Sequence, residues 1–211
     1  FLSDVSGFLL PSDLKYLKIS LDNRKYWAVT RLATLAVRLR TASAKPYYTK
    51  GRPSEIPISE QFYAGGPNSV RGWAIKELAI FNERNGVISY SGGNSILEAG
   101  VEIRYNLFLS KNPNDAVTGT DIVVFADAGN VWTEYNFRNI PKELPAQLFF
   151  AVGGGVRIRT LIGPVRLDFG YKLVDLQSLK VINNGVVQTI SPKAAKRLSP
   201  YSIQITLGQA F

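Results

Sequence analysis

Cysteine and histidine are both absent from the 211-residue chain. Without cysteine there are no disulfides and no thiolate metal ligands. Without histidine the usual general base, the Ser-His-Asp triad and imidazole metal ligands are unavailable. Carboxylates, lysine and tyrosine could still catalyse a reaction, but the two absences favour a protein that is not an enzyme. We expect no catalytic residue, no metal site and no cofactor.

Methionine and long apolar runs are missing as well. The chain begins at Phe1, and because translation begins with methionine, we expect it to be a fragment of a longer polypeptide. It has no run of about 18 apolar residues, so no transmembrane helix is predicted. A transmembrane β-barrel also lacks such runs, because its signature is the alternation of apolar and polar residues.

Acidic residues are outnumbered by basic ones, 16 to 25, which gives a formal net charge of +9. A basic balance is compatible with nucleic acid, anionic lipid or a polar channel lining as the partner. The charges are dispersed, and no basic run is interleaved with stacking aromatic residues as nucleic-acid binders require. We therefore expect no nucleic-acid partner.

Alternation of apolar and polar residues is the dominant pattern. In Leu97–Leu107 the odd positions are apolar or alanine, whereas Glu98, Glu102 and Arg104 lie on the opposite face. This period of two predicts a β-strand with one apolar side. Six further segments show the pattern, the first of them less regularly: Tyr16–Tyr26, Ala33–Thr41, Asp121–Trp132, Leu148–Thr160, Pro164–Lys172 and Tyr201–Phe211. The sequence thus predicts an all-β protein with about seven strands.

A transmembrane antiparallel β-barrel and a soluble β-sandwich or lipocalin-like barrel both fit such strands. The strands are roughly 9–13 residues long, enough to cross a bilayer at a tilt. Leu161–Gly163 is a tight connection, whereas Thr133–Gln147 and Asp175–Pro200 are long and polar, as on the two sides of an outer-membrane barrel. These features favour the membrane barrel. Because closed bacterial barrels have an even number of strands, we expect strands on the N-terminal side to complete this one.

A glycine-rich segment, Phe62–Trp73 (FYAGGPNSVRGW), lies within the long stretch 42–93 between two predicted strands. Alone, its Arg-Gly-Trp would indicate a turn with a solvated arginine. With its position, it resembles the inward-folding loop of the Omp85 superfamily. Four later segments resemble that family's last strands in the right order: Leu97–Leu107, Val123–Trp132, Gly153–Tyr171 and Ile203–Phe211.

The resemblance implies the C-terminal portion of a 16-stranded barrel. Residues 1–211 would supply about strands 10–16, with the inward-folding loop at 42–93. The N-terminal periplasmic domains and the early strands would lie outside this chain. The location implied is the outer membrane of a Gram-negative bacterium, in preference to an organelle outer membrane.

The resemblance also implies a contact that locks the loop inside the barrel. Arg71 would reach Asp127 and Glu102, both on the polar faces of their strands. Val70 completes the motif, Gly72 would permit a tight turn, and Trp73 could pack against the inner wall. The alternative is that the two carboxylates only face water in the lumen.

The last strand carries an outward apolar row, Tyr201, Ile203, Ile205, Leu207 and Phe211. Such C-terminal strands resemble the assembly signal of outer-membrane proteins. Gly208 is expected to weaken or kink the strand. The resemblance implies a weak barrel seam at this strand, and an ordinary closed seam is the alternative.

The function implied is an outer-membrane protein assembly and insertion factor. It would act through that weak seam by β-augmentation of unfolded outer-membrane client proteins. Its partners would be those clients, outer-membrane lipid, and accessory lipoproteins or other surface subunits. A translocation pore for a secreted protein is the first alternative. A barrel hydrolase using Asp168 and Lys172 and a passive porin are the others.

Overall fold

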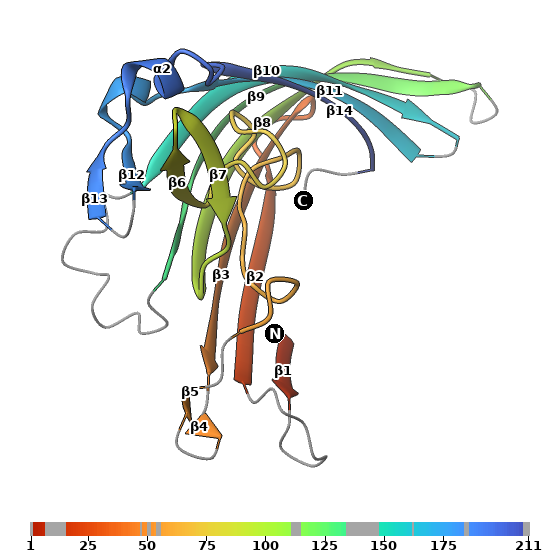
Figure 1. The fold of residues 1–211 in the computed structure, drawn as a ribbon. Helices are drawn as coiled ribbons and strands as arrows, with labels where there is room; N and C mark the ends of the chain where they lie inside the picture. The colour runs from red at the N-terminus through yellow and green to blue at the C-terminus, as the bar shows by residue number, and fades with distance from the viewer. Residues whose placement is uncertain are drawn as a thin grey trace.

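The computed structural model describes residues 2–6, 16–46, 48–49, 52–53, 56–110, 115–133, 148–161, 163–183 and 186–208. Eight strands form one curved antiparallel sheet, which we call the wall (Figure 1). In spatial order they are β1 (Leu2–Ser6), β2 (Tyr16–Ala28), β3 (Ala33–Pro46), β8 (Ser95–Leu109), β9 (Val117–Trp132), β10 (Phe149–Thr160), β11 (Gly163–Lys172) and β14 (Tyr201–Leu207). β1 and β14 are the two edges, so the barrel is not closed by the described residues.

The seven predicted strands are all present, and several are longer than the alternation indicated. β3, β8 and β9 contain 14, 15 and 16 residues, ample to cross a bilayer at a tilt. The first five residues of the stretch 42–93, up to Pro46, belong to β3 and therefore to the wall. β1 was not predicted, because its five residues, LSDVS, are too few to establish a period.

Burial along the wall is the reverse of that in a water-soluble sheet. On β8, Val101, Ile103 and Tyr105 are 44–47% exposed, whereas Glu98 and Glu102 are at most 3% exposed. The apolar side chains point to the convex face and the charged ones to the concave face. Apolar side chains outside and polar ones inside are what lipid around the barrel and a polar interior require.

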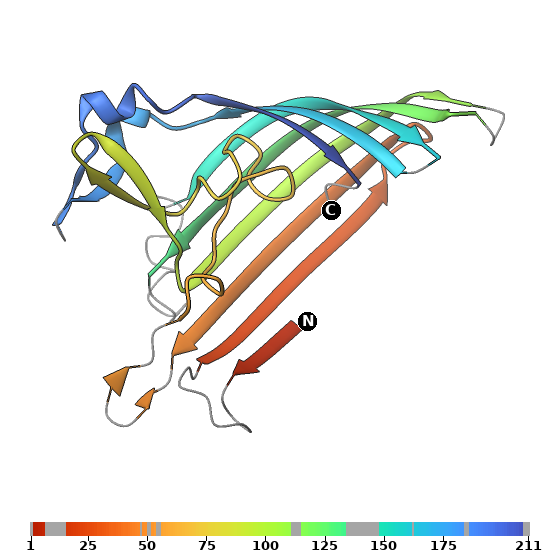
Figure 2. The same cartoon turned by 45° about the vertical axis from the view of Figure 1, so that its right-hand side comes forward.

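A second sheet lies at the end of the wall where the long connections leave it (Figure 2). It joins the hairpin of β6 (Ile80–Arg84) and β7 (Val87–Ser91) to the hairpin of β12 (Lys180–Asn183) and β13 (Val186–Thr189). The two hairpins meet in parallel at Ile182 and Asn82. Two distant loops therefore form one unit, which the sequence did not predict.

Short elements complete the fold: β4 (Tyr48–Thr49), β5 (Arg52–Pro53), η1 (Leu176–Ser178) and α2 (Pro192–Ala195). Across the described ranges, no helix has the length and apolarity needed to span a membrane. The apolar core lies on the concave side, between the wall and the segment 56–79, and includes the fully buried Val70, Trp73, Leu78 and Ile96.

Glu83 on β6 joins the two loops through Ser191, which is the N-cap of α2. The carboxylate accepts hydrogen bonds from the Ser191 hydroxyl and, at 2.9 Å, from the Ser191 amide. These two bonds stabilise the charged form and hold the pKa of Glu83 below its ordinary value. A lowered carboxyl pKa adds stability above the unfolded-state pKa, and that stability is lost as the pH falls through the folded-state pKa.

We therefore expect acid to loosen the contact between the two hairpins. Hydrogen exchange at residues 186–195, corrected for its intrinsic pH dependence, should be faster at about pH 3 than at neutral pH. In the Glu83→Gln variant, the amides of residues 186–195 should exchange faster at neutral pH, and their exchange rate should lose most of its dependence on pH. An unchanged pH dependence in this variant would show that another group controls the contact.

Candidate functional site: the inward-folded loop and its charged wall

The segment 56–79 runs along the concave face of the wall (Figure 2), and we call it the inner loop. Ala64 and Leu78 pair through reciprocal backbone hydrogen bonds and close its neck. Gly65 and Gly66 follow with φ of +92° and +104°, a region that favours glycine. The Gly66 amide donates to the Trp73 carbonyl at 2.9 Å, so the tip between them is a compact turn.

Arg71 lies at this tip and is 1% exposed. Its Nε and Nη2 donate to the two carboxylate oxygens of Asp127 at 2.8 and 2.9 Å, and its backbone amide donates to the same group at 3.0 Å. Its Nη1 forms an ion pair with Glu102. The guanidinium carbon lies 3.6 Å from the ring centroid of Phe125. A bidentate pair and a stacked ring are contacts that lysine could not reproduce.

The carboxylates that hold Arg71 belong to a larger buried network. Glu102 also accepts from Arg104 at 2.6 Å and from Arg157 at 3.4 Å. Arg157 in turn donates to Asp168 at 2.6 Å. Arg166 also lies 3.8 Å from Asp168, so four guanidinium groups face three carboxylates, counting Asp127. Removing one of these carboxylates leaves uncompensated positive charge in a buried site, which costs about 3–5 kcal/mol.

The motif residues beside Arg71 pack closely on the wall. Val70 is fully buried, and its side chain lies beside Gly129 of β9. A Cβ added to Gly72 would come within 2.6 Å of the Ala151 Cβ on β10, so glycine is needed for this close approach. Trp73 is fully buried and packs edge-to-face on Phe149, with ring centroids 5.4 Å apart.

Further anchors of the inner loop were not predicted. Lys172 of β11 binds Glu77 at 2.9 Å and lies 4.2 Å from the Trp73 ring centroid. Arg166 of β11 donates to the Pro67 carbonyl at 2.7 Å. The sequence placed Arg166 and Lys172 on an inward face, but nothing in it indicated which loop atoms they would meet.

The two residues suggested for a hydrolase are both held in ion pairs. Asp168 is fully buried beside Arg157, and Lys172 is occupied by Glu77. In the part of the chain that the structure describes, no group of three metal-ligating side chains is found. The arrangement is suited to holding a loop in place.

The apolar side chains of the terminal strand, β14, point away from the interior of the wall. Tyr201, Ile203, Ile205 and Leu207 are 49–73% exposed on the convex side, away from Arg71, Glu102 and Asp127. β14 ends at Leu207, and Gly208 has φ +98°. Phe211 is outside the described residues. On the inner face, Gln204 donates to the backbone carbonyls of Arg71 and Trp73, a contact that sequence reasoning missed.

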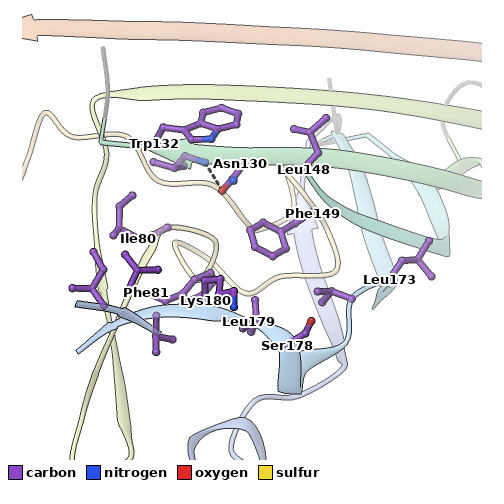
Figure 3. A pocket seen from close by; sticks show the side chains of 16 residues that line it. Ile80, Phe81, Asn130, Trp132, Leu148, Phe149, Leu173, Ser178, Leu179 and Lys180 are labelled. Atoms are coloured by element: carbon purple, nitrogen blue, oxygen red, sulfur yellow. Dashed lines mark hydrogen bonds between the residues drawn. The ribbon is translucent and has the colours of Figure 1, made fainter. Parts of the chain in front are cut away.

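An apolar cavity of about 640 Å³ lies between the second sheet and the ends of β9 and β10 (Figure 3). Phe149, which packs on Trp73, contributes to it, as do Phe81 and Leu179. Asn130, Ser178 and Lys180 are the polar side chains among its lining residues. The cavity therefore offers a largely hydrophobic surface.

The exposed apolar face, the charged inner face and the inward-folded loop define the wall of an outer-membrane-type β-barrel. The Omp85 superfamily domain matches residues 1–211, and the chain belongs to that superfamily.

Two relatives illustrate the similarity. The chain is 29% identical over 183 residues to the outer membrane protein assembly factor BamA of Neisseria meningitidis serogroup B, covering 77% of this chain and 22% of that protein. The chain thus spans about a fifth of the length of this relative. The crystal structure of BamA from Haemophilus ducreyi lacking POTRA domains 1–3 matches with a TM-score of 0.58 at 18% identity. That match covers 83% of this chain and 34% of the other.

The close approach at Gly72 provides a test of the loop position. Gly72→Ala should push the loop from the wall, lowering stability by about 1–3 kcal/mol, the usual cost of overpacking. The loss should appear as a lower temperature of the heat-modifiable gel shift. Gly154→Ala on β10, the strand that carries Ala151, is the control, because its Cβ would meet only the Val123 carbonyl, at 3.3 Å. Equal stability of the two variants would contradict the packing described here.

Proposed function

We propose that this chain forms the C-terminal barrel portion of a factor that assembles and inserts outer-membrane proteins. The observation that carries the proposal is the buried clasp of Arg71 by Asp127 and Glu102 within an Omp85 wall. The clasp holds the inner loop inside the barrel and so keeps the barrel in the conformation that inserts client proteins. Val70, Gly72 and Trp73 support it by packing.

In this mechanism, client strands bind at the barrel seam formed by β14. Among the described residues this strand pairs with β11 alone. Its other edge would meet the early barrel strands outside this chain, in a weak pairing that opens to a client strand. An unfolded client segment adds to that edge by β-augmentation, because a strand edge offers unpaired amide and carbonyl groups. The client strand then passes into lipid. No step forms or breaks a covalent bond, and none requires a cofactor or nucleotide.

The eight wall strands are half of a 16-stranded barrel. The wall has eight strands, because β1 adds one to the seven that the sequence predicted. The barrel resides in the outer membrane of a Gram-negative bacterium. Its partners are unfolded outer-membrane client proteins, outer-membrane lipid, and accessory lipoproteins or other surface subunits that contact the long loops.

A charge swap in the native protein tests the proposal. Arg71→Glu places a carboxylate against Asp127 and Glu102, which should destabilise the clasp by about 3–5 kcal/mol and abolish insertion of client barrels. Adding Asp127→Arg should restore part of the insertion. Barrel folding is scored by heat-modifiable gel mobility, and client insertion is scored with a folded reporter barrel.

Arg24→Glu is the matched control, because Arg24 is a solvent-exposed arginine of the same wall, paired with Asp22. It should leave insertion unchanged. If Arg71→Glu has no effect on folding or on clients, the loop is not a lock. If the wild-type protein itself inserts no clients, the assembly role is excluded, and a translocation pore for a secreted protein becomes the better explanation.

Photo-crosslinking tests the seam separately. A photoreactive residue at Ile205 of β14, which is 73% exposed, should crosslink a stalled client barrel. The same residue at Val101 of β8, also facing outward, should not, because β8 is already paired with β3 and β9. Equal crosslinking at both positions would place the client on the lipid-facing wall in general and not at the seam.

A further inference from the structure

β14 has fewer backbone partners than the interior strands of the wall. Within the described part of the chain its seven residues pair with β11, from Tyr171–Tyr201 to Val165–Leu207, and with no second strand. Its outward side chains contribute little packing, since Ile205 and Leu207 are each 73% exposed. The placement of this edge strand therefore depends on the β11 ladder and on contacts from its inner face.

Gln204 provides the main inner contact. It is 8% exposed at the middle of β14, opposite Asp168. Its Nε2 lies 3.1 Å from the Arg71 carbonyl oxygen and 2.9 Å from the Trp73 carbonyl oxygen. Both atoms are acceptors, so the amide must present its NH₂ group to them, and the Ser202 hydroxyl oxygen is a third acceptor, 3.3 Å from the same nitrogen.

Two glycines bring the loop backbone within reach of β14. A Cβ on Gly170 of β11 would lie 2.5 Å from the Arg71 carbonyl oxygen, and one on Gly72 would lie 3.3 Å from the Tyr171 carbonyl oxygen. The loop backbone therefore rests directly on β11, next to the inner face of β14. Larger residues at these positions would separate Gln204 from both carbonyls.

The tip of the inner loop consequently contacts both sides of this part of the wall. The Arg71 side chain is held by Glu102 of β8 and Asp127 of β9, whereas the backbone at 71–73 is held by Gln204 of β14. β10 and β11 lie between these strands in the sheet. The tip thus connects the central strands β8 and β9 with the edge strand β14.

We propose that Gln204 is a positioning residue that couples the inner loop to the terminal strand. When the tip is clasped, Gln204 holds β14 against the loop. When the tip leaves, β14 loses these two hydrogen bonds at once. The position of the loop therefore controls how readily β14 moves. That this movement opens the barrel seam rests on the proposed function.

A double-mutant cycle in the native protein tests the coupling. Gln204→Leu keeps an inward side chain of similar size but removes the donor, and Arg71→Ala releases the tip. Hydrogen exchange at residues 201–207 should accelerate about tenfold in Gln204→Leu, as expected for the loss of two hydrogen bonds. Exchange at residues 95–109 should stay unchanged. Adding Gln204→Leu to Arg71→Ala should accelerate hydrogen exchange in β14 little further, because the contact between the loop tip and Gln204 is already lost.

Thr206→Val is the matched control. Thr206 lies on the same inner face of β14, and its hydroxyl has no hydrogen-bond partner among the described residues. This variant should exchange like the wild type. Additive effects of Gln204→Leu and Arg71→Ala would overturn the coupling, as would equal acceleration in Thr206→Val.

Client insertion, measured on the same variants, separates this inference from the proposed function. If the cycle is non-additive and Arg71→Ala still inserts clients normally, the coupling holds and the clasp is not needed for insertion. If the cycle is non-additive and the wild-type protein inserts no clients, the coupling holds and the assembly role fails. If Arg71→Ala abolishes insertion and the cycle is additive, the assembly role holds and Gln204 does not transmit the state of the loop.

Discussion

The buried guanidinium of Arg71 is the interaction on which the arrangement of the inner loop depends. A charge at a loop tip leaves water only when partners replace its hydration, and Asp127, Glu102 and the Phe125 ring together replace it here. The two carboxylates are themselves buried, and Glu102 is shared with Arg104 and Arg157, so removal of either carboxylate would leave buried positive charge uncompensated. The loop, β8, β9 and β10 are thereby constrained as one unit, and Gln204 extends that unit to β14.

This network exists because the wall separates two environments. Its convex face is apolar and exposed, as lipid requires, so the polar side chains of strands such as β8 and β9 face inward. An interior lined only with charges would fill with water. The inner loop brings Val70, Trp73 and Leu78 into it and builds an apolar core beside the charged cluster. Packing and charge pairing therefore act on the same short turn, and the glycines around it allow the close approach that both need.

The errors and omissions of the sequence interpretation have physical causes. β1 was missed because five residues carry too little periodicity. The joined hairpins β6–β7 and β12–β13 were missed because their contact, between Asn82 and Ile182, links loops about a hundred residues apart. Lys172 was noted only as a possible catalytic group, and its pairing with Glu77 depends on where the inner loop turns. Gln204 could not be identified at all, since its partners are backbone carbonyls that carry no sequence signature.

The sequence by itself determined the β-class, seven of the wall strands and, in the regular ones, the face on which the side chains lie, because a period of two is a local property of an extended chain. Through its ordered motifs it also indicated the family and the group of Arg71, Glu102 and Asp127. The tertiary structure alone decided the geometry: the bidentate pairing of Arg71 with Asp127, the sharing of Glu102 among three arginines, and the contact of the loop backbone with β14. These features depend on the path of the inner loop across the curved wall. That path results from the packing of residues distant in sequence, which no local pattern encodes.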